Sequence, residues 1–110
     1  MPTVELQGMA LVNIDTVLTD TLRLLKNAEP PGGVLLLSYK RNRSIAIIKK
    51  DAILFEIRED GYEQQVFDLS GARLARELKT LIKREFPRSR KVRVVRFAHP
   101  EELDREWKVY

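Results

Sequence analysis

Four short β-type segments follow one another between residues 34 and 69, with only small turns between them. They read VLLLSY from Val34, SIAIIKK from Ser44, AILFEIR from Ala52 and YEQQVFDL from Tyr62. Runs rich in β-branched and aromatic residues that end at turn residues are typical of strands. Four consecutive strands joined by hairpins make an antiparallel meander, and this is the arrangement that the sequence predicts.

The turns between these segments carry residues suited to tight reversals. Asp60-Gly61 predicts a hairpin whose centre has a positive φ, which glycine adopts easily. Lys50-Asp51 predicts another turn. The basic segment 40–43 predicts a hairpin tip in which Asn42 takes the left-handed conformation.

Side-chain alternation indicates how these strands face the core. In the third segment Ile53, Phe55 and Ile57 point to one side, which we expect to be the core. The opposite side of that segment is only partly polar. Residues 34–37 are apolar on both sides, which favours a place in the middle of the sheet.

Two amphipathic segments predict helices before and after the meander. The first spans residues 15–27, with Asp15 as its N-cap, and a Pro-Pro-Gly-Gly sequence follows it. The second spans residues 70–86, capped by Asp68 or Ser70. Its apolar stripe is expected to lie against the sheet and consists of Leu74, Ala75, Leu78, Leu81, Ile82 and Phe86.

The remaining segments complete the predicted fold. Residues 91–97 read as a fifth strand, and Pro100 begins a short acidic helix that runs through Trp107. Residues 4–6 and 9–12 are candidates for a short edge strand interrupted by Gly8. We therefore expect residues 1–110 to form one α+β domain, a two-layer sandwich. It has a four-stranded antiparallel meander plus a fifth strand, an N-terminal helix, a long amphipathic helix and a short C-terminal helix.

Positive charge is concentrated in one segment. The chain has a net charge of +4, and residues 82–97 carry seven cations against one carboxylate. Residues 1–81 are balanced, and residues 98–110 carry a net −2. The whole excess of positive charge therefore lies between residues 82 and 97, in a helix end, a loop and a strand.

A cationic groove at this segment would bind a phosphate backbone, because cations that neutralise phosphates release counterions. The candidate nucleic-acid-binding residues there are Lys83, Arg84, Arg88, Arg90, Lys91, Arg93 and Arg96, and the hairpin tip adds Lys40, Arg41 and Arg43. The alternative is a solvated basic face, partly neutralised within the fold by Glu101, Glu102, Asp104 and Glu106.

Tyr39 stands beside the cations of the hairpin tip, an arrangement found in proteins that bind single strands. The alternative is that Tyr39 pairs across the hairpin. Trp107 and Tyr110 are candidates for a partner anchor. Alternatively, Trp107 packs with Leu103 to attach the last helix to the core.

Catalysis has little support in this sequence. No cysteine is present, which excludes disulfides, thiolate chemistry and Cys-based zinc sites. His99, the only histidine, stands before Pro100 and is expected to cap a helix. Asp51 with Glu56-Ile57-Arg58 only faintly resembles the acid pattern of metal-dependent nucleases. We expect no cofactor and no metal, and lean against an enzyme.

The N-terminal segment lacks the basic start and apolar run of a signal peptide, so a cytoplasmic location without membrane association is expected. The lack of cysteine and the many charged residues resemble the composition of proteins from hot environments.

The sequence supports two candidate functions. The first is a small non-enzymatic domain that binds RNA or DNA without sequence preference. The second is a homodimeric interaction or assembly domain whose interface is the sheet surface and the terminal helix. The partly apolar sheet face offers Ala46, Ile48, Ala52 and Leu54 as candidates.

Overall fold

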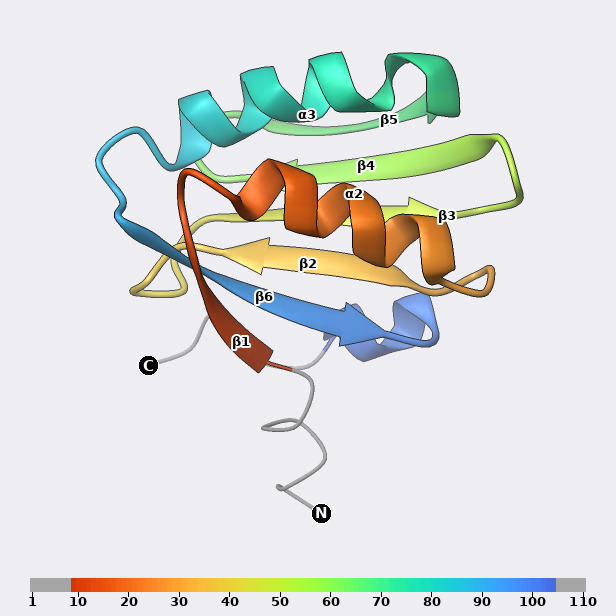
Figure 1. Cartoon of the computed structure of the whole chain (residues 1–110), viewed down its shortest axis with the longest axis horizontal. Helices are drawn as coiled ribbons and strands as arrows, with labels where there is room; N and C mark the ends of the chain where they lie inside the picture. Colours follow the sequence, from red (N-terminus) through yellow and green to blue (C-terminus); the bar gives the residue numbers. More distant parts are fainter. Residues whose placement is uncertain (1–8, 105–110) are drawn as a thin grey trace.

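A computed structural model describes residues 9–104 of the chain. They form one six-stranded antiparallel sheet with the order β1-β6-β2-β3-β4-β5 (Figure 1). The strands are β1 (Met9–Asn13), β2 (Gly33–Leu37), β3 (Ser44–Lys49), β4 (Leu54–Asp60), β5 (Gln64–Ser70) and β6 (Lys91–Phe97). Every residue of β2 is buried, as expected for a strand that is apolar on both faces.

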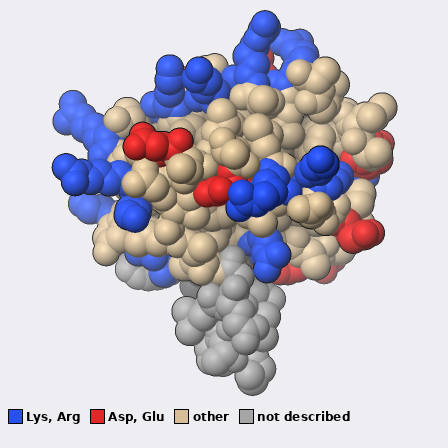
Figure 2. All heavy atoms as spheres, viewed as in Figure 1, with Lys and Arg blue, Asp and Glu red and all other residues tan. Residues whose placement is uncertain are grey.

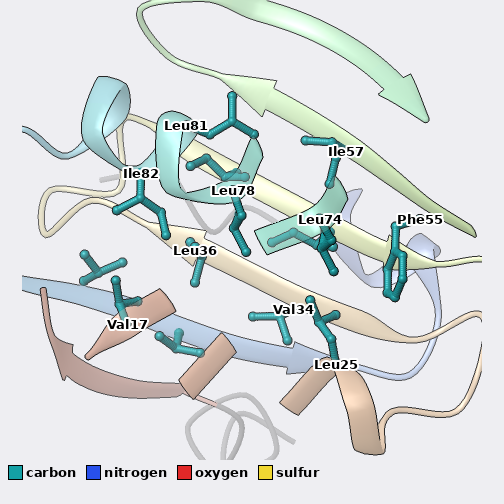
Figure 3. Close-up of a cluster of buried hydrophobic side chains, with 14 of the residues drawn as sticks. Val17, Leu25, Val34, Leu36, Phe55, Ile57, Leu74, Leu78, Leu81 and Ile82 are labelled. Carbon is teal, nitrogen blue, oxygen red and sulfur yellow. The ribbon is translucent and has the colours of Figure 1, made fainter. Parts of the chain in front are cut away.

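Both helices, α2 (Val17–Asn27) and α3 (Gly71–Glu85), cover the same face of the sheet. Their apolar stripes and the facing strand residues form one buried cluster, which Figure 3 shows closing the space between the two layers. Leu78 and Leu81 of α3, Ile57 of β4, and Val17 and Leu25 of α2 all belong to this cluster. The apolar periodicity of each helix therefore decides which side of that helix packs against the sheet.

The general α+β class is confirmed, but the predicted element count is wrong. The sheet has six strands instead of four plus one, because the edge segment at Met9–Asn13 pairs with β6. The described residues contain two α-helices, and after β6 they form a 3-10 helix, η1 (Pro100–Asp104); the rest of the helix predicted through Trp107 lies outside the described residues. Residues 4–6, Trp107 and Tyr110 lie outside the described residues, so the expectations for them stay untested.

The second face of the sheet carries its own smaller buried cluster. Leu35, Ala46, Ile48, Val95 and Phe97 belong to it, and Met9 and Leu103 pack against it. Ala46 and Ile48, which the sequence suggested as an apolar interface, are therefore already buried within one chain.

Ile53 is not a core residue, contrary to the alternation expected from the sequence. It lies in the β3–β4 turn with 72% of its surface exposed. Asp51 shapes this turn, because its Oδ1 accepts the backbone N–H groups of Ile53 and Leu54 at 2.9 Å each. Strand β4 consequently begins only at Leu54, and of the three predicted residues only Phe55 and Ile57 belong to the core cluster.

Two turns and one cap differ from the sequence predictions in their detail. No described glycine has a positive φ, and the left-handed residue of the β2–β3 hairpin is Arg41, at φ 64°, instead of Asn42. Gly61 is required for space, since a Cβ there would collide with the Glu85 carboxylate. Thr16, not Asp15, occupies the N-cap of α2.

Candidate functional site

The two basic turns of the sequence lie at the same end of the sheet. Strands β2 and β6 are antiparallel neighbours, with Leu37 opposite Arg93, so the end of β2 lies beside the start of β6. This pairing places the β2–β3 connection, residues 38–43, next to the α3–β6 connection, residues 86–90 (Figure 1). In Figure 2 the blue atoms of Lys and Arg gather along the corresponding left edge of the molecule.

A cavity of about 500 Å³ lies between these two connections. Five of the residues that line it are cationic and none is acidic. Its lining residues are Ser38, Tyr39, Lys40, Asn42, Arg43, Arg88, Ser89, Arg90 and Lys91. We call this the basic cavity. Its volume lies within the range of roughly 300–1,000 Å³ in which small ligands are bound.

Ser38 shapes the hairpin wall of the basic cavity. Its buried hydroxyl donates to Asn42 Oδ1 at 2.8 Å and accepts the backbone N–H groups of Asn42 and Arg43 at 3.2 and 3.1 Å. The Arg41 N–H donates to the Ser38 carbonyl at 2.8 Å, which closes the turn. These bonds hold Lys40 at the exposed tip, where its charge faces water.

The cations of the basic cavity have no acidic partner in the described part of the chain. No ion pair joins Lys40, Arg88, Arg90 or Lys91 to a described carboxylate. Glu102, one of the acids expected to neutralise the basic segment, accepts the N–H groups of Ala98 and His99, beyond the other end of β6. Glu106 lies outside the described residues.

Arg84 differs from these cations, because it forms a bidentate ion pair with a carboxylate. Its Nε and Nη2 each lie 2.9 Å from one oxygen of the Glu59 carboxylate, which is buried. Gln65 Nε2 donates to the same carboxylate at 2.7 Å. The guanidinium of Arg84 is thus engaged within the fold and lies outside the basic cavity.

Arg43 and Arg93 are also held by the fold, through backbone carbonyls and aromatic rings. Arg43 Nε donates to the Glu85 carbonyl at 2.7 Å, and its guanidinium lies 4.8 Å from the centre of the Tyr62 ring. Arg93 Nε donates to the Tyr39 carbonyl at 3.0 Å, and its guanidinium lies 4.7 Å from the Tyr39 ring centre. Arg93 therefore supports one wall of the basic cavity from behind.

The other three predicted residues are not among those that line the basic cavity. Lys83 borders an apolar groove between α3 and the start of α2, together with Ile14 and Phe86. Arg96 borders a depression near Asp20 on α2. Arg41 directs its Nη2 toward Met9 Sδ at 3.9 Å. The fold thus brings together Lys40, Arg43, Arg88, Arg90 and Lys91 of the ten predicted residues.

A buried pair of carboxyls, Glu59 and Glu85, lies beside this region. Burial by itself raises the pKa of Glu59, but hydrogen bonds from Arg84, Glu85 and Gln65 together outweigh it and lower that pKa. Burial and the neighbouring Glu59 raise the pKa of Glu85, and the N–H groups of Tyr62 and Glu63 oppose this only in part. Burial and the contact between the two carboxyls therefore favour the protonated form of Glu85 more than that of Glu59.

Sequence reasoning missed these two glutamates, although both follow a visible pattern. Glu59 continues the alternation of Phe55 and Ile57 on the core side of β4. Glu85 lies four residues after Leu81 and three after Ile82, on the apolar stripe of α3. A carboxylate at a position that periodicity assigns to the core is the signal that would have identified both.

Three residues considered for catalysis have structural roles. His99 Nδ1 accepts the Glu101 N–H at 3.3 Å, which agrees with the predicted capping role. Asp51 holds the β3–β4 turn, and Glu56 pairs with Arg58 Nε at 2.7 Å. Among residues 9–104, no group of three His, Asp or Glu side chains is arranged to hold a metal ion.

The fold and the cavity together define an α+β domain whose sheet carries a cationic cavity at one end. No family model, no curated protein and no solved structure matches this chain. Neither helix of the described region is long and apolar enough to cross a membrane.

Proposed function

We propose that this protein binds nucleic acid, non-enzymatically and without sequence preference, through the basic cavity. The observation that carries this proposal is the lining of the cavity. Five cations from two segments far apart in the sequence surround it, and no described carboxylate contributes to it. Local excess charge that no described carboxylate neutralises favours a polyanionic ligand.

The chemistry of the lining residues suits phosphate. Arg88 and Arg90 offer planar guanidinium groups that bind phosphate with two hydrogen bonds, and Lys40 and Lys91 add point charges. Ser89 and Asn42 add uncharged polar groups between them. Because phosphates are the same in every sequence, such contacts give affinity without base preference.

The test is the triple change Arg88→Ala, Arg90→Ala and Lys91→Ala. Each cation that neutralises a phosphate of a single strand contributes about 0.7 to the slope of log affinity against log salt. The triple variant should therefore lose about 2 units of that slope and about 100-fold in affinity at about 0.1 M salt. Fluorescence anisotropy with labelled oligonucleotides of about 12 nucleotides measures both quantities.

A matched control separates a specific surface from net charge alone. Arg73→Ala, Arg76→Ala and Lys79→Ala also remove three cations, from exposed positions on α3. This control should keep most of the affinity. Absence of binding by the unaltered protein at low salt, or affinity that does not weaken as salt rises, would contradict the proposal.

The homodimer predicted as the alternative has less support, since Ala46 and Ile48 are buried within one chain. Sedimentation velocity at micromolar concentration tests this alternative. We expect a monomer under these conditions. A stable dimer would favour an interface at Ala52, which is exposed, and Leu54, which is half-buried.

A further inference from the structure

Tyr39 is an exposed aromatic residue on the wall of the basic cavity. Its exposed fraction is 61%, so burial explains little of its presence there. The pairing of β2 with β3 ends at Leu37 opposite Ser44, so Tyr39 has no partner across the hairpin ladder. Its ring contact is instead with Arg93 of β6, 4.7 Å from the ring centre.

Arg93 supports the Tyr39 ring while leaving much of it accessible. The guanidinium stacks on the ring and its Nε donates to the carbonyl of Tyr39, so side chain and backbone are held by one residue. A ring fixed in this way loses little conformational entropy when a flat ligand stacks on it. Tyr39 therefore has the properties of a preorganised stacking platform.

The platform and the phosphate-binding cations share one cavity. Tyr39 lies on the hairpin wall, whereas Arg88, Arg90 and Lys91 come from the α3–β6 side. A nucleotide joins a flat base to an anionic phosphate, so it matches both walls at once. In a duplex the bases are paired and stacked inside the helix, and only the phosphates would be available.

We infer that the basic cavity takes a single strand, with one unpaired base stacked on Tyr39 while adjoining phosphates contact Arg88, Arg90 and Lys91. This inference rests on the proposed nucleic-acid binding and adds the form of the ligand. The stack is indifferent to base identity, because every base has a π-face. It is therefore compatible with binding that lacks sequence preference.

Tyr62 offers a matched control within the same chain. It is also an exposed tyrosine, at 64%, and also carries an arginine stacked on its ring, Arg43 at 4.8 Å. It does not line the basic cavity. Because Tyr62 contacts Arg43, which lines the cavity, loss of the Tyr62 ring should affect the base-bearing and the abasic single strand equally, whereas loss of the Tyr39 ring should affect only the base-bearing strand.

The experiment compares Tyr39→Ala, Tyr39→Leu, Tyr39→Phe and Tyr62→Ala on three ligands of equal length: a single strand, a duplex and an abasic single strand. RNA and DNA are both used. Tyr39→Ala and Tyr39→Leu should weaken binding of the base-bearing single strand by about 5- to 150-fold, whereas Tyr39→Phe should retain it. The salt slope should not change, because the ring carries no charge.

The abasic strand isolates the contribution of stacking, since it keeps the phosphates and lacks the bases. The unaltered protein should bind it more weakly than the base-bearing strand, and Tyr39→Ala should cause no further loss. Equal affinity for both strands, or a duplex bound as tightly as the single strand, would overturn the inference. The proposed function would then still stand if the Arg88, Arg90 and Lys91 triple change abolished binding. No binding of any ligand by the unaltered protein would overturn both.

Discussion

Replacing Phe86 with alanine is expected to lower the free energy of unfolding by about 3–5 kcal/mol. Phe86 is 1% exposed, and its ring belongs to the cluster between the helices and the sheet. It also ends α3, because its N–H donates to the Ile82 carbonyl at 2.9 Å, and its own carbonyl accepts from Ser89 at 3.4 Å. Removing the ring leaves a cavity and loosens the anchor of the loop that carries Arg88 and Arg90.

Leu25→Ala is the matched control for this prediction. Leu25 is equally buried, at 1%, but lies near the end of α2 and contributes nothing to the basic cavity. Its loss should cost about 2–5 kcal/mol without changing affinity for nucleic acid at a temperature where the variant is folded. Urea unfolding measures stability in both variants. Phe86→Ala should weaken binding in addition, and equal affinities for the two variants would contradict the anchoring role.

Replacing Glu85 with alanine should lower the free energy of unfolding by about 2–4 kcal/mol. The Glu85 side chain is fully buried and accepts the N–H groups of Tyr62 and Glu63 at 2.9 and 3.2 Å, so its loss removes both bonds and leaves a cavity. Glu85→Gln should cost less, since its amide can still accept from Tyr62 and donate to Glu59. Urea unfolding compares the two variants, and an alanine variant within about 0.5 kcal/mol of the unaltered protein would contradict this role.

The Glu85 carboxyl should also make stability depend on pH. Because its pKa is raised in the folded state, the folded chain binds more protons than the unfolded chain above the ordinary value of 4.5. The free energy of unfolding should therefore fall as pH rises through the raised pKa. Glu59, whose pKa is lowered, acts in the opposite sense and loses its stabilising contribution only as pH falls below 4.5.

Urea unfolding between about pH 4.5 and about pH 8 tests this dependence. The unaltered protein should lose stability across that range, whereas Glu85→Gln, which cannot ionise, should show a flatter profile. Parallel profiles for the two proteins would show that the proton on Glu85 is not linked to folding.

Local patterns in the sequence were sufficient to predict most helices and strands, but not to predict all of their first and last residues. Residues 91–97 form the predicted strand without a shift of boundary, because alternation and the preceding Phe86-Pro87 act over short distances. The prediction that Ile53 faces the core is wrong, because hydrogen bonds to the Asp51 side chain extend the turn as far as Ile53. The alternation of apolar residues carries no information about such bonds. The same limitation applies to Gly61, whose requirement comes from Glu85, 24 residues later in the chain.

For the candidate site, the sequence indicated where positive charge is concentrated. It could not distinguish the cations that are paired within the fold from those that line the cavity. Arg84 and Arg88 are four residues apart and look equivalent in the sequence, yet Arg84 is paired with buried Glu59 and Arg88 lines the cavity. The difference arises from the helical periodicity of α3 combined with the position of β4. A count of charges along the sequence contains no information about the helical periodicity of α3 or the position of β4.

By itself the sequence determined the kinds of element, the antiparallel hairpins and the segment that carries the excess charge, since each depends on residues near one another in the chain. Only the tertiary structure decided that β6 enters the sheet between β1 and β2. That non-local pairing brings residues 88–91 beside residues 38–43 and so creates the basic cavity. Strand order of this kind depends on how the whole core packs, and short-range patterns do not encode it.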